Sequence, residues 1–150
     1  MQSQNFTTTL LADQSPAEVF ETLKDVRRWW TGLYNEHIEG STDKLGDEFT
    51  FAAGDGAHFT KQKLVELVPD KKIVWLVTDS RLTFISDPAE WTGSKIGFDI
   101  SKKGDKTEVR FTHEGLRPEN ECYDSCSSAW GQYMKQSLQP LLSKTKTQKQ

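Results

Sequence analysis

The sequence predicts an α+β fold in which an antiparallel sheet of six or seven strands curves around a long C-terminal helix. One observation is that the chain from Tyr34 to Glu114 consists of short apolar runs separated by turn sequences, as in successive hairpins. A second is that apolar residues near the end recur in steps of three and four, which places them on one helix face. These residues are Tyr123, Cys126, Trp130, Tyr133, Met134, Leu138 and Leu141. So broad a face needs a large partner surface, and the preceding chain supplies mostly strands.

The chain is expected to begin with a strand and two short helices. Phe6–Ala12 is rich in Thr and Leu and is typical of a strand. Ser15 is expected to cap the next helix, with Pro16 as its first residue and Glu18 completing a capping box. A second short helix is predicted over Asp25–Thr31. Both are expected to lie on one face of the sheet.

The remaining strands are expected between tight turns that are marked by Gly, Pro, Asp and Lys. Lys72–Thr78 carries apolar residues on both faces, which predicts a central strand. The segment that follows, Asp79–Thr92, is expected to be irregular. The strands are predicted over Ile38–Ser41, Glu48–Ala53, Ala57–Val68, Lys72–Thr78, Ser94–Ser101 and Lys106–Glu114.

The C-terminal helix is predicted to start at Asn120, whose side chain can cap the first turn. Pro140 removes one backbone hydrogen bond, so an end or a kink is expected near Gln136–Gln139. Residues 143–150 are polar and rich in Lys, and they are predicted to be a disordered tail. Residues 1–142 are expected to form a single domain.

Composition and charge argue against several protein classes. Apolar residues make up 35% of the sequence and charged residues 27%, as in an ordinary soluble protein. The net charge of −3 argues against binding to nucleic acid, which requires a basic surface. No apolar run approaches the ~20 residues that span a membrane. The N-terminus also lacks the pattern of a signal peptide.

The two cysteines indicate a reducing compartment. Cys122 and Cys126 are one helical turn apart and would point in the same direction, which is a poor geometry for a disulfide. They are therefore expected to be free thiols in a cytoplasmic protein. The oligomeric state is left open between a monomer and a homodimer.

No pattern in the sequence predicts a metal, a cofactor or a catalytic residue. His37, His58 and His113 are far apart in the sequence, and no HExxH or paired CxxC motif occurs. Cys122 and Cys126 could bind a metal only with a histidine that is near in space, and small core or surface thiols are the favoured interpretation. Neither GxSxG nor GxGxxG is present, which argues against a serine hydrolase and a phosphate loop.

Five strings, taken in order, carry a resemblance to a known family. They are SPAEVFETL, RRWWTG, VELVPDKKIVWL, WTGSKIGFDISKKGDKTEVRFTHEGL and WGQYMKQSLQPLL. With these strings the chain resembles the START-like (SRPBCC) superfamily with its helix-grip fold. Within that superfamily it resembles the group named after the activator of the heat shock protein 90 ATPase. The resemblance covers about Asn5 to Leu142, and its order rather than any one string makes it specific.

The resemblance implies a deep, mostly apolar cavity between the sheet and the C-terminal helix. Relatives bind lipids, hormones, sterols or polyketides in this cavity, and a few act as cyclases or aromatases. The activator that names the group assists a chaperone and carries a further N-terminal domain. This chain is expected to lack that domain because its first strand starts near Phe6. Full co-chaperone activity is therefore less expected.

Aromatic side chains are expected to line the cavity where the strands meet the C-terminal helix. The alternative is that they fill an ordinary core. His113 and Tyr133 could orient a ligand, and His113 could act in acid–base chemistry, although a hydrogen-bonded core histidine is the alternative. The candidate ligand-binding residues are Trp30, Phe51, Trp75, Trp91, Phe98, Phe111, His113, Trp130, Tyr133 and Met134.

Three functions are compatible with this sequence. The first is binding of a small lipophilic molecule in the cavity without catalysis. The second is a stress-linked protein that contacts a chaperone through its surface, which a collapsed cavity and an exposed apolar patch would favour. The third is a cyclase-type enzyme that uses the same cavity, which a strongly shifted pKa on His113 or a nearby carboxylate would favour.

Overall fold

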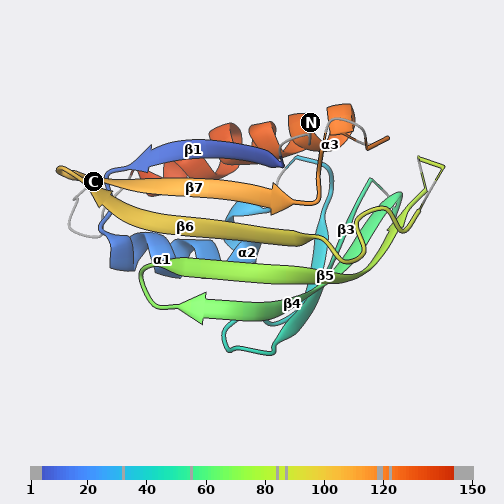
Figure 1. Ribbon diagram of the computed structural model, residues 1–150, viewed down its shortest axis with the longest axis horizontal. Coiled ribbons are helices and arrows are strands. Elements are labelled where there is room, and N and C mark those ends of the chain that lie inside the picture. The colour runs from blue at the N-terminus through green and yellow to red at the C-terminus, as the bar shows by residue number, and fades with distance from the viewer. Residues whose placement is uncertain are drawn as a thin grey trace.

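The computed structural model describes residues 5–143, except positions 32, 55, 84, 87, 118, 119 and 122. The described residues form a seven-stranded antiparallel sheet with the order β1-β7-β6-β5-β4-β3-β2 (Figure 1). The strands are β1 (Phe6–Ala12), β2 (His37–Gly40), β3 (Glu48–Ala53), β4 (His58–Val68), β5 (Lys72–Leu82), β6 (Lys95–Lys103) and β7 (Lys106–Glu114). The predicted fold class is confirmed, and β5 is the central strand as its two apolar faces predict.

Helices cover one face of this sheet (Figure 1). The helices are α1 (Pro16–Lys24), α2 (Val26–Trp29), α3 (Tyr123–Gln132), the π-helical segment η1 (Tyr133–Leu138) and α4 (Gln139–Leu142). Along β7 the buried residues Thr107, Val109, Phe111 and His113 alternate with more exposed ones. Because strand side chains point to opposite faces in turn, this alternation turns one apolar face towards the helices.

The capping box that the sequence predicts for α1 is present. The Ser15 hydroxyl oxygen accepts a hydrogen bond from the Glu18 backbone N–H at 3.2 Å. The Glu18 carboxylate in turn accepts one from the Ser15 N–H at 3.0 Å. Two backbone donors that have no partner within the helix are thereby satisfied.

Replacing Ser15 with Ala should lower the free energy of unfolding by about 0.5–2 kcal/mol, because the first turn of α1 loses its cap. Denaturant unfolding measures this change. Ser128→Ala on the exposed side of α3 is the matched control and should change stability by less. Equal effects of the two substitutions would contradict a capping role for Ser15.

One prediction for the strands is wrong. Asp79–Leu82, expected to begin an irregular segment, continue β5 as strand. They pair with the start of β4, where His58 lies opposite Leu82 and a register shift follows Lys61. The polar sequence of this stretch has little strand propensity, so the long partner strand decides its conformation.

The C-terminal helix changes its winding where a kink is predicted. The wide turn of η1 is marked by a hydrogen bond from the Gln139 N–H to the Met134 carbonyl, five residues earlier. Pro140 has no N–H, so the regular ladder of hydrogen bonds cannot continue through it. The wide turn therefore comes just before the proline, and α4 follows.

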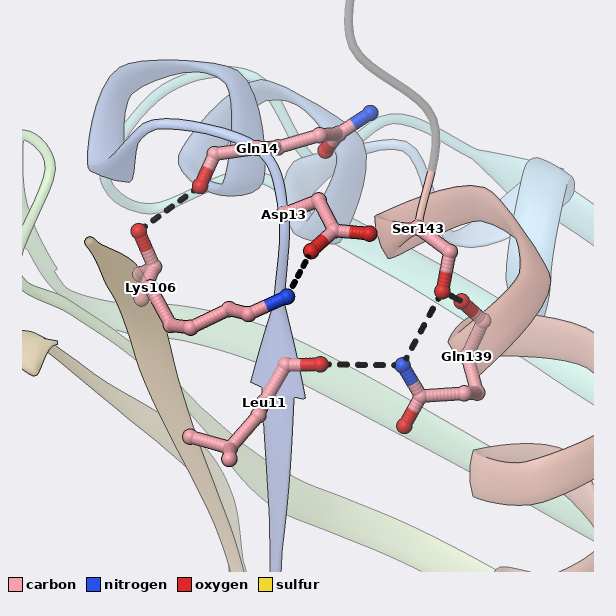
Figure 2. Close-up of polar contacts among 7 residues, drawn as sticks. Leu11, Asp13, Gln14, Lys106, Gln139 and Ser143 are labelled. Atoms are coloured by element: carbon pink, nitrogen blue, oxygen red, sulfur yellow. Dashed lines mark hydrogen bonds and ion pairs between the residues drawn. The ribbon is translucent and has the colours of Figure 1, made fainter.

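The end of the C-terminal helix forms hydrogen bonds with β1 and with the turn that follows β1. Figure 2 shows the Gln139 amide donating to the Leu11 carbonyl, at 3.0 Å, and to the Ser143 hydroxyl. The Asp13 N–H donates to the Leu142 carbonyl at 3.0 Å. Because these contacts join the two ends of the described chain, they fix the C-terminal half of the helix against the sheet.

The predicted tail lies almost entirely outside the described residues, which end at Ser143. Ser143 itself closes α4, since its N–H donates to the Gln139 carbonyl at 3.1 Å. In the described part of the chain, no helix is long and apolar enough to cross a membrane.

Candidate functional site

A cavity of about 260 Å³ lies between the first half of the C-terminal helix, the β3–β4 hairpin and the chain around Trp91. Its aromatic wall consists of Trp30, Tyr34, Phe51, Trp91, Trp130 and Tyr133. The rest of the wall consists of Ala53, Gly54, Ala57, His58, Ser125, Cys126 and Ala129. Tyr34, Gly54 and Ser125 are exposed and mark the mouth of the cavity.

The aromatic wall is held by ring-to-ring contacts. Trp30 stacks on Phe51 with ring centroids 4.2 Å apart, and it contacts Trp130 at 5.1 Å. Trp91 and Trp130 lie nearly parallel with centroids 6.0 Å apart. All four side chains are at most 4% exposed. These four rings are therefore part of the packed core and are set in place before any ligand arrives.

The structure brings half of the predicted site residues to this cavity. Trp30, Phe51, Trp91, Trp130 and Tyr133 line it. The other five candidates are buried but are not among the lining residues, namely Trp75, Phe98, Phe111, His113 and Met134.

Those five belong to the packed core beside the cavity. Phe98 contacts Trp29 at 5.4 Å and Trp75 at 6.2 Å, so the short helix α2 fills the space over this part of the sheet. The alternation of strand residues correctly predicts that Phe98 and Phe111 are buried. Whether a buried strand residue lines the cavity depends on which helix covers that part of the sheet.

Sequence reasoning missed the small residues that leave the cavity open. Ala53, Gly54 and Ala57 lie at the β3–β4 hairpin, and Ser125 and Ala129 lie one turn apart on α3. Small side chains facing each other from two segments leave room that larger ones would fill. The signal was the run Ala52-Ala53-Gly54 at the end of an apolar strand.

His113 connects two of the three tryptophans of the wall through hydrogen bonds. The Trp130 Nε1–H donates to His113 Nδ1 at 3.1 Å. Because Nδ1 accepts, the neutral ring carries its proton on Nε2, which donates to Ser94 Oγ at 2.9 Å. The Ser94 hydroxyl then donates to the Trp91 carbonyl at 2.6 Å. This network joins the helix, the sheet and the loop around the cavity.

The role of His113 is structural in this arrangement. Burial, and secondarily the neighbouring His58, lowers the pKa of His113 to about 3. The side chain is fully buried and both ring nitrogens have partners. These contacts correspond to the core-histidine alternative, because no nitrogen is left to exchange a proton with a ligand.

His58 lines the cavity, although in the sequence it is only one of three histidines that lie too far apart to predict a metal site. Its ring meets Trp91 edge-on at 4.7 Å and Phe51 at 5.7 Å. Burial lowers the pKa of His58 to about 4, so the imidazole is neutral at neutral pH. The cavity wall therefore presents polar atoms here without a charge.

The Glu36 carboxylate connects the segments at the mouth of the cavity through hydrogen bonds. The Tyr133 hydroxyl donates to Glu36, whose carboxylate also accepts from the backbone N–H groups of Leu33 at 3.2 Å and Tyr34 at 3.0 Å. Burial would raise the pKa of the Glu36 carboxyl, but these hydrogen bonds lower it overall. The Tyr34 hydroxyl donates to Gln132 at 2.7 Å. The loop before β2 is thus tied to the helix, and Glu36 remains ionised.

The thiol and metal expectations can be followed only in part. Cys126 is a buried cysteine in the cavity wall, whereas Cys122 lies outside the described residues, so two free thiols stay a prediction. No group of three or more His, Cys, Asp or Glu that could hold a metal occurs in the part of the chain that the structure describes.

Solved structures with the same fold include several bacterial proteins. The solution structure of the Aha1 dimer from Colwellia psychrerythraea has a TM-score of 0.72 and 22% identity, covering 93% of this chain and 96% of that one. Protein CV1439 from Chromobacterium violaceum has a TM-score of 0.70 and 15% identity, with coverage of 93% and 97%. Mll3558 from Rhizobium loti has a TM-score of 0.68 and 20% identity, with coverage of 94% and 98%. At these identities the likeness shows the fold alone.

Family membership rests on the sequence. A search of curated proteins found no match. The family model described as Activator of Hsp90 ATPase homolog 1-like protein matches residues 13–143, which is most of the chain. The fold and the match agree with the START-like resemblance of the sequence. The chain therefore belongs to the family of Activator of Hsp90 ATPase homolog 1-like proteins.

Proposed function

We propose that this protein binds a small lipophilic molecule in the cavity beneath α3, without catalysing a reaction on it. The observation that carries this proposal is about 260 Å³ of open space walled by six aromatic side chains. Ligand sites are concave and mostly apolar, with a few polar groups that set orientation. Binding would be driven by burial of apolar ligand surface, at roughly 25 cal/mol per Å².

In this proposal the ligand contacts Trp30, Phe51, Trp91, Trp130 and Tyr133. Phe111 and His113 support this wall from the core side, since their ring centroids lie 4.6 Å and 6.0 Å from that of Trp130. Mass spectrometry of small molecules carried by natively purified protein tests the proposal directly. A reproducible apolar molecule is expected. Protein that carries none, and that binds no apolar dye, would contradict the proposal.

Ala129→Phe should abolish binding of an environment-sensitive apolar dye while the protein stays folded. Ala129 is half-buried in the cavity wall, so a larger side chain enters open space rather than a packed core. Dye fluorescence measures binding, and circular dichroism checks folding. Ser128→Phe on the exposed side of the same helix is the matched control and should keep dye binding. Undiminished binding by Ala129→Phe would place the dye elsewhere.

Activation of a chaperone is the second candidate function, and the family description favours it. The test is the ATPase rate of heat shock protein 90 with and without excess protein. Stimulation that persists in the Ala129→Phe variant would point to a surface contact that is independent of the cavity. A cyclase-type activity has less support. The pKa of His113 is strongly lowered, but burial is the main cause and both ring nitrogens already have partners.

A further inference from the structure

The size of the cavity limits which ligands fit. An engineered apolar cavity of about 150 Å³ accommodates benzene, and drug-sized ligands occupy roughly 300–1,000 Å³. The volume here, about 260 Å³, lies between these values. It suits one or two fused rings and is too small for a sterol or a lipid with two acyl chains.

The charges around the cavity disfavour an anion. Among the described lining residues there is no lysine or arginine that could pair with a ligand carboxylate. A carboxylate lies at the mouth instead. Glu36 accepts a hydrogen bond from the hydroxyl of Tyr133, which lines the cavity. Burying a ligand carboxylate without a cationic partner costs free energy, and a negative charge nearby increases that cost.

The aromatic wall favours an aromatic ligand over an aliphatic one. Six of the thirteen described lining residues carry an aromatic ring of Trp, Tyr or Phe. Aromatic rings in edge-to-face or offset-stacked contact attract one another by more than their buried area accounts for. The described lining residues also include no aspartate or glutamate that could pair with a ligand cation, so burying a cation there is unfavourable.

On the basis of the ligand-binding function proposed above, we propose that the ligand is an uncharged aromatic molecule of one or two rings. The cavity then discriminates in three ways. Volume rejects sterols, the lack of a cationic lining residue rejects carboxylates, and the aromatic wall favours aromatic over aliphatic molecules of equal size.

Binding of four probes at neutral pH tests this selectivity. Naphthol is the expected ligand type, naphthoate adds a negative charge, decanol replaces the rings by a chain, and cholesterol exceeds the volume. Calorimetric titration should show naphthol binding at least about tenfold more tightly than naphthoate or decanol, and cholesterol not binding. Glu36→Gln, which removes the charge but keeps an acceptor for Tyr133, should narrow the difference between naphthol and naphthoate.

The outcomes separate this inference from the function on which it rests. Naphthoate, decanol or cholesterol binding as tightly as naphthol would overturn the aromatic, uncharged class while leaving ligand binding intact. Naphthol binding that is equally tight in the Ala129→Phe variant, or the absence of binding by every probe, would overturn the proposed function itself.

Discussion

Replacing Met134 with Ala should lower the free energy of unfolding by about 2–5 kcal/mol, the range for truncating a large buried side chain. Met134 is 1% exposed, and it belongs to the packed core rather than to the cavity wall. Truncation therefore creates a hole between close neighbours instead of enlarging a space that is already open. Denaturant unfolding of wild type and variant measures the change.

Lys135→Ala is the control for this substitution, because Lys135 is the next residue along η1 and is exposed. Its effect should stay within about 0.5 kcal/mol, as for most surface substitutions. If Met134→Ala cost no more than this control, Met134 would border open space. The cavity would then extend deeper beneath the helix than the structure shows.

Acidification below pH 6.5 should destabilise the protein by several kcal/mol. The folded-state pKa values of His58 and His113 are about 4 and about 3, below the ordinary value of 6.5. Between these values the unfolded chain binds more protons than the folded chain, so stability falls as the pH falls. Above pH 6.5 both states are neutral at these sites and the contribution is constant. A proton on His113 Nδ1 would also face the Trp130 Nε1–H and break that hydrogen bond.

Denaturant midpoints measured between pH 6.5 and pH 4 test this expectation. Carboxylates also weaken the folded state in acid, so the informative quantity is the difference in pH dependence between variants. His113→Asn removes one titrating ring and should flatten the dependence. His37→Asn, at an exposed position of β2, is the control and should leave it unchanged. An identical slope in wild type and His113→Asn would show that His113 does not titrate in this range.

Local patterns in the sequence predict most of the fold. Lys106–Glu114 is an example, since this strand has the predicted bounds and the expected alternation of buried residues. The capping box at Ser15 is equally local, because its donors and acceptors lie within four residues. Asp79–Leu82 could not be predicted in this way, since their conformation depends on pairing with β4.

The candidate site was likewise predictable from local patterns only in part. Sequence alternation and helix spacing by themselves determined that Phe51 and Trp130 belong to the apolar interior, because these patterns assign each side chain to a face. They could not distinguish cavity from core. Only the tertiary structure decided that Met134 packs in the core while Ala129 borders open space. The physical reason is that a cavity forms where small side chains from segments distant in sequence face each other, and no single segment encodes that meeting.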